Sequence, residues 1–561
     1  MSSTTSHGAE DDGTAQVRSP EISTAAALLE ATVHALTKRT PAIVASAAQE
    51  LGTTALGLHF GDGSHVYMKA VGDALTISNQ QHETTVECYF QDHSLVQLFD
   101  LEQKPVELVR DQFFDARGTA DAVLAAWRTF QVLSQRAAGL RVVQNLWASY
   151  RQARQLDPLV KGYVEVARGT TTAERYPIPN AAVALRENTA AVLRTASVAT
   201  SRVLWDGEKG SGWWEIPGPR DADLAEILDH CRRRVGAAVE QFVPDHEPRR
   251  DLYDLMKDYP ARGGKGLRPA LCLATCGAFG GQAEDAIRTA VAIEMFHNAF
   301  LIHDDISDES EFRRGKPCMH ISHGPGLAVN AGDGLNLMAV DAILSNLERL
   351  GLARTLGLIH EIIFMCRETI EGQAMELGWI RYNEIPEDDE SYHIMVTKKT
   401  GWYTCMSPCR LGAVAAGCTR PLELDAIGNV FHKVGVAFQI QDDLLNLLGK
   451  EELYGKEPLG DLLEGKRTLM LIHLMRSLPS TDREEVREWL RKPRLGKTQA
   501  EAEWVLSLMH REGSIKYGTE VAMDYAAQAT RLFETDLGFL PESEPKAVLR
   551  QVANYVNTRE L

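Results

Sequence analysis

The sequence predicts a mainly α-helical protein, in which a large all-α domain follows a small α+β domain. Length is the first reason, because 561 residues exceed what one hydrophobic core usually organises. The other two reasons are patterns: apolar residues recur with helical spacing through the C-terminal part, and a shorter zone before it alternates with period two. The boundaries we expect are a disordered tail at 1–22, the α+β domain at 23–139, a connector at 140–222 and the helical domain at 223–561.

The composition is that of an ordinary globular protein, with 44% hydrophobic and 24% charged residues. A formal net charge of −18 argues against nucleic acid as a partner, since phosphate backbones need a surplus of Lys and Arg on the binding face. The nine cysteines are odd in number and scattered, as expected of reduced thiols. We find no signal peptide and no apolar run near the roughly 20 residues that cross a bilayer, and we expect a cytoplasmic protein without a transmembrane segment.

The α+β domain is expected to begin with a helical stretch at Ala25–Leu51. Gly61-Asp-Gly then separates two alternating segments, which predicts a β-hairpin, and the alternation continues at Leu75–Ile77 and Thr84–Phe90. Apolar residues at helical spacing in Ala122–Leu133 predict a closing helix. The connector that follows mixes helical patches with Gly, Pro and Thr, and predicts only partial structure.

The helical domain contains an apolar helix at Ala290–Ile302, and an acidic cluster follows directly at the end of this helix. Asp304 and Asp308 are four residues apart, so their carboxylates project from one face of the helix, one turn from each other. Such like charges repel unless a cation bridges them, and Mg²⁺ prefers oxygen ligands and contacts substrate phosphates. Arg313 and Arg314 follow with paired guanidinium groups that match phosphate oxygens.

A second acidic cluster lies downstream on another apolar helix. Val434, Phe438, Asp442 and Asn446 occupy successive i, i+4 positions on one face, which places Asp442 at the end of an apolar stripe. Two apolar helices that both end in carboxylates predict an apolar cavity capped by a divalent-metal site. Such a cavity suits a ligand with a diphosphate head and a hydrocarbon tail.

Basic residues accompany the two clusters. Lys265 and Arg268 lie in a glycine-rich turn that enters a helix, which is a plausible anion site. Lys399 and Thr400 follow a helix that is expected to end near Val396. The remaining polar candidates lie in a loop-like stretch and are Lys456, Asp461 and Lys466.

Taken in order, these segments resemble one known family. The blocks are G-G-K-G-L-R-P, D-D-I-S-D with R-R-G-K-P, K-T, F-Q-I-Q-D-D-L-L-N and E-G-K-R-T. The set looks like that of the trans-isoprenyl diphosphate synthases, the family of the farnesyl and geranylgeranyl diphosphate synthases, and covers about 223 to the last residue. The resemblance implies an all-α bundle around a deep cavity, normally a homodimer, that uses about three Mg²⁺ ions to condense isopentenyl diphosphate with an allylic diphosphate.

The resemblance also implies roles for single residues. The Mg²⁺ ligands would be Asp304, Asp308 and Asp442. The allylic diphosphate would be contacted by Arg313, Lys399 and Lys456, with Lys466 nearby. The diphosphate of isopentenyl diphosphate would be bound by Lys265, Arg268, His297 and Arg314. Oxygen dipoles facing the developing carbocation would come from Thr400 and Gln439, and carboxylates that support the metal ligands from behind would be Asp305, Asp443 and Asp461.

Two departures from the family pattern stand out: Asn446 closes the second cluster where Asp is frequent, and Glu376 replaces a usual Asp. Product length can be argued from the helix before Asp304, along which the tail would grow at about 1.5 Å per residue. Phe300 would lie one turn down with the small Ala299 beside it, and Phe296 two turns down. We favour a C20 product with Phe296 as the floor, and C15 as the alternative.

The segments at 61–69, 83–90 and 95–99, with the later helix, are similar in layout to sterol-carrier-type lipid-binding domains. That resemblance implies capture of a hydrophobic product or contact with lipid, and a folded extension that only aids assembly is the alternative. For the helical domain, a class I terpene cyclase would need an Asn/Ser/Glu metal triad instead of the second Asp cluster. A non-catalytic accessory subunit would have eroded metal ligands, whereas the set here is nearly complete.

Overall fold

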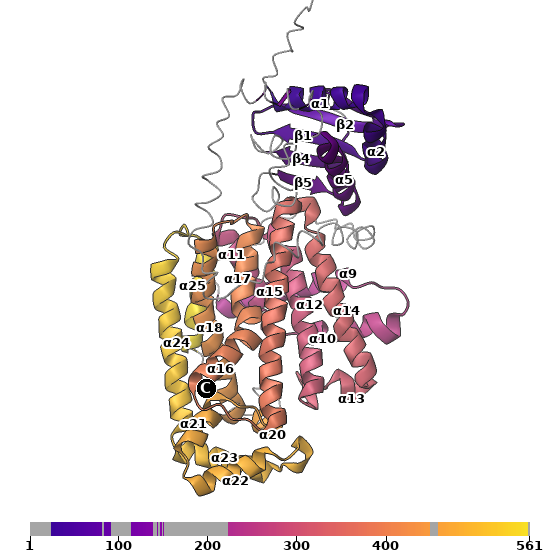
Figure 1. Cartoon of the computed structure of the whole chain (residues 1–561). Helices are drawn as coiled ribbons and strands as arrows, with labels where there is room; N and C mark the ends of the chain where they lie inside the picture. The colour runs from indigo at the N-terminus through magenta and orange to yellow at the C-terminus, as the bar shows by residue number, and fades with distance from the viewer. Residues whose placement is uncertain are drawn as a thin grey trace, which may run out of the picture. The chain divides into compact units, whose positions relative to one another are not determined.

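The computed structural model describes residues 24–80, 83–90, 114–137, 143, 146, 147, 150, 223–448 and 458–558. They belong to two compact units, within 1–193 and 194–561, which are coloured by residue number in Figure 1. The predicted tail, nearly all of the predicted connector, the segment at 95–99 and Lys456 lie outside the described residues. The predicted fold class is confirmed, since a small sheet with helices precedes an all-α bundle.

The N-terminal unit is a five-stranded sheet with helices packed against it. Its helices are α1 (Ala25–Arg39), α2 (Pro41–Leu51) and α5 (Ala120–Ala137). Its strands are β1 (Ala55–Phe60), β2 (His65–Val71), β3 (Ala74–Ser78), β4 (Val86–Phe90) and β5 (Phe114–Gly118). The strand order is β3-β2-β1-β4-β5, and only the β1–β4 pair is parallel. The predicted hairpin is therefore the β1–β2 pair.

The core of this unit follows from the alternation. Leu58, Met68 and Cys88 lie on one sheet face and are buried, whereas the alternate positions are more exposed. The single helical stretch predicted at Ala25–Leu51 was wrong in one respect, because two helices occupy it. Pro41 stands at the first turn of α2, where its missing N–H costs nothing, but inside one continuous helix it would break the hydrogen-bond ladder.

The C-terminal unit is a helical bundle. Its first half comprises α9 (Leu224–Phe242), η4 (Arg249–Tyr253), α10 (Asp254–Ala261), α11 (Leu267–Ala278), α12 (Ala283–Ser307), the short strands β6 (Phe312–Arg313) and β7 (Lys316–Pro317), α13 (Met319–His323), α14 (Pro325–Leu344) and α15 (Leu347–Tyr382). Its second half comprises α16 (Asp389–Val396), η5 (Thr397–Met406), α17 (Ser407–Ala415), α18 (Pro421–Leu448), α20 (Gly460–Glu464), α21 (Leu469–Ser477), α22 (Ser480–Leu490), η6 (Arg494–Gly496), α23 (Gln499–Arg511), α24 (Ser514–Asp536) and α25 (Glu544–Thr558).

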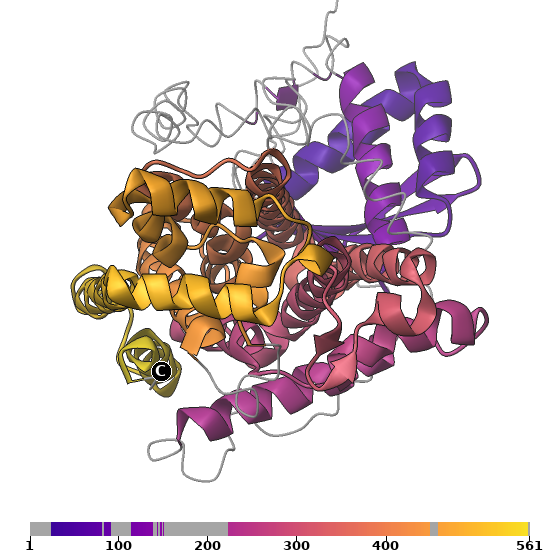
Figure 2. The same ribbon diagram turned by 90° about the horizontal axis from the view of Figure 1, so that it is seen from below.

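The long helices that carry the acidic clusters are central to this bundle. Helix α12 begins at a capping box formed by Gln282 and Asp285 and packs on α11 and α14. Helix α18 packs on α24 and on η5. Figure 2 views the bundle from its end, with α22 and α23 lying across it. The apolar stripes read from the sequence therefore face the shared core.

Helix α14 is the one helix among the described residues that is long and apolar enough to cross a membrane by length and composition. The mean hydropathy is 1.2 over an 18-residue window of this 20-residue helix. Its apolar run is interrupted by Asn330, Asp333, Asn336 and Asp341. In the structure α14 packs closely against α12, and 44% of its apolar window is buried inside the protein.

A close helix–backbone approach fixes the segment η5, which has π-helical hydrogen bonding. At Gly372 of α15, an added Cβ would overlap the backbone nitrogen and Cα of Lys399. Only glycine allows the two backbones to come this close. The glycine thereby sets where Lys399 stands.

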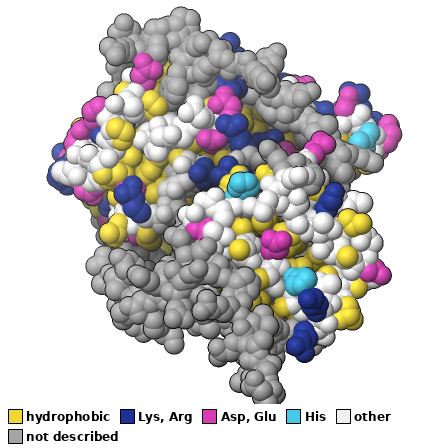
Figure 3. Space-filling model, turned by 90° about the horizontal axis from the view of Figure 1, so that it is seen from above, with side chains coloured by type: hydrophobic (Ala, Val, Ile, Leu, Met, Phe, Trp, Pro, Cys, Tyr) yellow, Lys and Arg dark blue, Asp and Glu magenta, His cyan; other side chains and the backbone are white. Residues whose placement is uncertain are grey.

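Charged side chains of both signs are interspersed with hydrophobic ones on the face shown in Figure 3. The described part of that face presents no continuous basic surface.

Candidate active site

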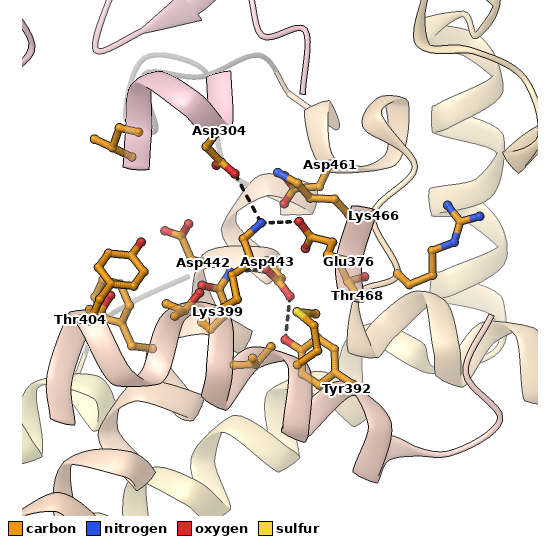
Figure 4. Close-up of a pocket in the computed structure, with 18 of the residues that line it drawn as sticks. Asp304, Glu376, Tyr392, Lys399, Thr404, Asp442, Asp443, Asp461, Lys466 and Thr468 are labelled. Carbon is orange, nitrogen blue, oxygen red and sulfur yellow. Dashed lines mark hydrogen bonds and ion pairs between the residues drawn. The ribbon is translucent and has the colours of Figure 1, made fainter. Parts of the chain in front are cut away.

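A cavity of about 190 Å³ opens among the helix ends of the C-terminal unit (Figure 4). Helices α12, α15, α16 and α18, the segment η5 and the turn around α20 all contribute to its wall. The lining residues that the sequence analysis predicted are Arg268, His297, Asp304, Arg313, Lys399, Thr400, Gln439, Asp442, Asp443, Asp461 and Lys466. Side chains from five separate sequence blocks therefore meet at one place.

The first acidic cluster occupies the C-terminal end of α12. Asp304 accepts a hydrogen bond from Gln373 Nε2 at 3.0 Å, and its Oδ1 lies 3.5 Å from Lys399 Nζ. Asp308 caps the helix, and its Oδ2 lies 3.0 Å from Lys466 Nζ. Burial and the neighbouring charge of Asp304 raise the pKa of Asp308 to about 7, against the opposing pull of Lys466. Carboxylates held this close favour a cation between them.

Between these two residues, Asp305 turns away from the cavity and is fully buried. It accepts hydrogen bonds from Tyr259 OH at 2.6 Å and from Arg313 Nε at 2.9 Å. Burial alone would lower the pKa of Arg313, but the Asp305 carboxylate outweighs burial and holds that pKa above its ordinary value. Asp305 thus anchors a guanidinium that itself lines the cavity.

The second acidic cluster ends α18. Asp442 and Asp443 both line the cavity, and the buried Asp443 accepts hydrogen bonds from Tyr392 OH and Gln439 Nε2, both at 2.7 Å. Burial and the nearby Asp461 raise the pKa of Asp443 to about 8. Asn446 accepts a hydrogen bond from the Asp461 backbone N–H at 3.0 Å. The residue that departs from the family pattern therefore helps to hold α20.

Two lysines bridge the carboxylates. Lys399 pairs with Glu376 as well as Asp304, as the dashed lines of Figure 4 show. Lys466 lies 3.2 Å from Asp461 Oδ1 in addition to its contact with Asp308. Burial acts to lower the pKa of each lysine, but the surrounding carboxylates prevail and raise it above the ordinary value. Both ammonium groups thus stay positive beside the cavity.

The basic end of the cavity gathers around Tyr403 of η5. The Arg268 guanidinium lies 4.6 Å from the centre of the Tyr403 ring, and His297 stacks on the same ring at 5.9 Å. Burial and the charges of Arg268, Arg314 and Arg313 hold the pKa of His297 well below its ordinary value, so the imidazole is neutral. Lys265 Nζ lies 5.5 Å from the centre of the Phe438 ring, although Lys265 itself is not among the lining residues.

Arg314 lies beside this end. Its Nη1 donates to the Tyr259 backbone oxygen at 3.3 Å, and its backbone has a positive φ of 54°. A Cβ at Gly264 would lie 2.9 Å from the Arg314 guanidinium, so the glycine-rich turn makes room for that side chain. The turn and Arg314 are thereby brought together.

The three residues proposed to set product length lie beside the cavity rather than in its lining. Phe296 and Phe300 stack with ring centres 6.2 Å apart, and Phe300 meets the edge of Tyr403 at 5.6 Å. Ala299 is fully buried. Their role in product length stays a prediction.

The sequence profile of the polyprenyl synthetase family matches residues 249–509. The chain is 34% identical over 340 residues to the short chain isoprenyl diphosphate synthase of Methanothermobacter thermautotrophicus, covering 60% of this chain and 100% of that relative. It is 30% identical to the geranylgeranyl diphosphate synthase of Methanosarcina mazei, covering 60% and 99%. The chain belongs to the polyprenyl synthetase family. The resemblance drawn from the five sequence blocks is confirmed.

Solved structures agree with the family assignment. The geranylgeranyl pyrophosphate synthetase of Pyrococcus horikoshii is similar with a TM-score of 0.54 and 30% identity, covering 60% of this chain and 99% of that one. A geranylgeranyl pyrophosphate synthase of Corynebacterium glutamicum, solved with isoprenyl diphosphate and magnesium, gives 0.53 and 26%, covering 60% of this chain and 100% of that one. The chain is a prenyltransferase that makes trans-prenyl diphosphates. The match at 249–509 leaves the N-terminal unit untested.

The cavity of this polyprenyl synthetase fits a divalent cation and a diphosphate. Among the described residues, no three His, Cys, Asp or Glu side chains gather closely enough to enclose an ion alone. Carboxylate oxygens are ligands that Mg²⁺ prefers, and Asp304, Asp308 and Asp442 would hold it together with water and diphosphate oxygens. At the basic end, His297 Nδ1 and Arg268 Nε are buried without a hydrogen-bond partner among the described residues. Such atoms are costly unless a ligand meets them.

Sequence reasoning missed several residues of this synthetase site. Gln373 contacts Asp304 and stands one helical turn before Glu376. This i, i+3 spacing places both side chains on one face of the helix, and it could have indicated that Gln373 belongs to the site. Tyr259 and Tyr392 hold the buried Asp residues but come from distant segments with no motif of their own. Tyr403 stands one turn after Lys399, a spacing that pointed to the same wall.

Proposed function

We propose that this prenyltransferase condenses isopentenyl diphosphate with an allylic diphosphate in a Mg²⁺-dependent reaction and releases the C20 product geranylgeranyl diphosphate. One observation carries the proposal: two acidic clusters at helix ends meet the basic end of the same cavity. One diphosphate would bind beside the acidic clusters and the other beside the basic pocket. Mg²⁺, when bound, supplies positive charge to the diphosphate leaving group.

The chain's own residues divide the work between the two substrates. Asp304, Asp308 and Asp442 would hold the metal. Arg313, Lys399 and Lys466 would neutralise the allylic diphosphate as its C–O bond ionises, since fixed charges stabilise a leaving group without reorganisation. Lys456 would join them, although it lies outside the described residues. Isopentenyl diphosphate would meet Lys265, Arg268, His297 and Arg314.

The carbocation needs protection from water, which would convert it to an alcohol. The Phe438 and Tyr403 rings line the cavity together with Leu301, Met395 and Val396. Thr400 and Gln439 line it as well, and the Gln439 amide nitrogen is engaged by Asp443, which fixes the orientation of that side chain. The double bond of isopentenyl diphosphate would attack the cation, and the released diphosphate would accept the proton.

A C20 product is supported by two relatives named geranylgeranyl synthases, at 30% and 31% identity. C15 is the alternative from the sequence analysis, and a 28% identical relative from Natronomonas pharaonis is named a geranylfarnesyl diphosphate synthase. The terpene cyclase alternative is disfavoured by the unpartnered atoms of Arg268 and His297, which a second diphosphate would satisfy. The accessory-subunit alternative is disfavoured by the intact acidic clusters.

The test is a Mg²⁺-dependent assay with labelled isopentenyl diphosphate and dimethylallyl, geranyl or farnesyl diphosphate, with products sized after phosphatase treatment. A C20 product that disappears in Asp304→Ala supports the proposal. A ladder ending at C15 or C25 would replace the C20 assignment. Absence of incorporation with every primer would remove the synthase proposal for this chain.

Two other parts of the proposal rest on the family resemblance, a homodimer and about three Mg²⁺ ions in each site. A cytoplasmic location and domain boundaries at 22, 139 and 222 rest on the composition and the residue patterns. Contact between the N-terminal unit and a lipid or hydrophobic product belongs with them. Size-exclusion chromatography with light scattering tests the dimer, and vesicle flotation of the full chain with and without residues 1–139 tests the lipid contact.

A further inference from the structure

A short turn outside the five sequence blocks reaches the edge of the cavity. It is η6 with the residue that follows it, between α22 and α23. From this turn, Arg494 Nη1 lies 2.7 Å from Glu464 Oε1 and donates to the Asp308 backbone oxygen at 3.3 Å. Lys497 Nζ donates to the Leu463 backbone oxygen at 3.0 Å. Two basic side chains from one turn therefore hold the end of α20.

The contact of Arg494 continues toward the cavity through a row of alternating charges. The other oxygen of Glu464, Oε2, lies 2.7 Å from Lys466 Nζ. Lys466 in turn lies 3.0 Å from Asp308 Oδ2. The row thus runs from a guanidinium to a carboxylate, then to an ammonium, and ends on a carboxylate of the first acidic cluster.

This row is shielded from water. The exposed fractions of the side chains are 14% for Arg494, 9% for Glu464 and 13% for Lys466. Charges in such surroundings interact more strongly than exposed pairs and are screened less by salt. Removing one member therefore changes the balance of forces on its neighbours.

Lys466 is the member whose position matters for substrate. Its ammonium group is attracted by the Glu464 carboxylate on the side of the η6 turn. On the cavity side it is attracted by the carboxylates of Asp308 and Asp461. Arg494 shares the negative charge of Glu464, which weakens the outward pull on the ammonium. Without Arg494, Glu464 would hold Lys466 alone and draw it away from the cavity.

We propose that Arg494 is a positioning residue: by sharing Glu464, it keeps the Lys466 ammonium available to the diphosphate of the allylic substrate. The inference rests on the proposed function, because it assigns Arg494 to one of the two substrates. It predicts an effect on the allylic substrate and none on isopentenyl diphosphate, whose pocket lies around Arg268 and Tyr403.

The test compares Arg494→Met with Arg491→Met in the full-length chain. Arg491 directly follows α22, three residues before Arg494. Its side chain is 53% exposed, and its ion pair is with Glu488 on the surface. Loss of one charge-assisted contact should raise the KM for the allylic diphosphate about ten-fold in Arg494→Met, with the KM for isopentenyl diphosphate unchanged. Arg494→Lys, which keeps a charge beside Glu464, should recover most of the affinity.

The mechanism makes a sharper prediction for the double variant. Adding Glu464→Gln to Arg494→Met removes the outward pull, so the allylic KM should return toward the wild-type value. A purely structural role for Arg494 predicts the opposite, since two lost contacts would do more damage than one. Melting temperatures of all variants separate a stability effect from a positioning effect.

A binding measurement covers the case in which turnover fails. Titration calorimetry with inorganic diphosphate and Mg²⁺ should show about ten-fold weaker binding for Arg494→Met than for Arg491→Met. Equal allylic KM values and equal diphosphate affinities in the two variants would overturn the inference. A wild-type protein that incorporates no isopentenyl diphosphate would overturn the proposed function instead, and the calorimetric comparison would still decide the role of Arg494.

Discussion

Helices α12 and α18 end in similar pairs of adjacent Asp residues, and the structure treats the second member of each pair alike. Asp305 on α12 accepts a hydrogen bond from Tyr259 OH at 2.6 Å, and Asp443 on α18 accepts one from Tyr392 OH at 2.7 Å. Each tyrosine comes from a distant segment. The two helix ends are therefore built on the same plan, in which a tyrosine hydroxyl holds the second, buried Asp.

The remaining partner distinguishes the two ends. Asp305 faces the guanidinium of Arg313, whereas Asp443 faces the neutral amide of Gln439. Arg313 supplies a full counter-charge at the end of α12, whereas burial and Asp461 raise the pKa of Asp443 to about 8. The difference teaches that the α12 wall of the cavity holds a charged pair and the α18 wall a carboxylate with a neutral partner.

The largest expected effect compares the cavity-facing residues. Asp304→Asn should lower kcat about a thousand-fold and Asp442→Asn about a hundred-fold, because the first change also strips Lys399 and Gln373 of a partner. Single-turnover incorporation of labelled isopentenyl diphosphate measures both. Equal losses would break the comparison between the two walls.

The tyrosines give the next effect. Tyr259→Phe should lower the free energy of unfolding by about 2 kcal/mol and Tyr392→Phe by about 1 kcal/mol. Tyr259 OH also accepts a hydrogen bond from the Met319 backbone N–H at 3.2 Å, so its removal takes one hydrogen bond from each of two buried groups. Urea unfolding followed by circular dichroism measures the difference. A larger loss in Tyr392→Phe would reverse the assignment of the two ends.

Both helices also carry a histidine, buried on α12 and partly buried on α18, and the two should differ in their effect on substrate. His297→Asn on α12 should raise the KM for isopentenyl diphosphate about ten-fold, a loss of about 1.4 kcal/mol, because His297 Nδ1 lies buried at the basic end. His432→Asn on α18 should leave both KM values unchanged, since His432 contacts Thr397 away from the cavity lining. Steady-state kinetics with each substrate varied in turn separates the outcomes.

The smallest expected effect is the pH dependence of stability that His432 imparts. Burial lowers the pKa of His432 to about 4 from an ordinary 6.5, so between these values the unfolded chain binds a proton that the folded chain does not. The stability that His432 contributes to the folded state is therefore full above pH 6.5 and is lost as the pH falls toward 4. Between pH 7.5 and 5.5, wild type should lose about 1 kcal/mol more stability than His432→Asn. Parallel urea titrations at the two pH values would refute this if both proteins lost the same amount.

Much of the site could be predicted because its residues lie at fixed spacings on single helices. Asp304 and Asp308 share a helix face by their i, i+4 spacing, and Asp442 follows an apolar stripe in the same way. Helical spacing needs no knowledge of the rest of the fold. The same holds for the glycine-rich turn before α11, which begins at Leu267 directly after Gly266.

The unpredicted parts depend on contacts between segments far apart in the sequence. Tyr392 meets Asp443 across 51 positions, and Arg494 meets Glu464 across 30. No local pattern marks a tyrosine or an arginine for such a contact. The break at Pro41 was readable from the missing N–H of proline, and was overlooked because apolar spacing continues on both sides of it.

The close approach at Gly372 has a consequence for how this enzyme can vary. Every other side chain begins with a Cβ, and that atom alone would collide with the Lys399 backbone. A library randomised at this one codon and selected for prenyl diphosphate production should return glycine and nothing else, while the neighbouring exposed Ile370 tolerates many replacements. A single hydrogen atom in place of a methyl group thus marks a boundary of the sequence space open to this enzyme.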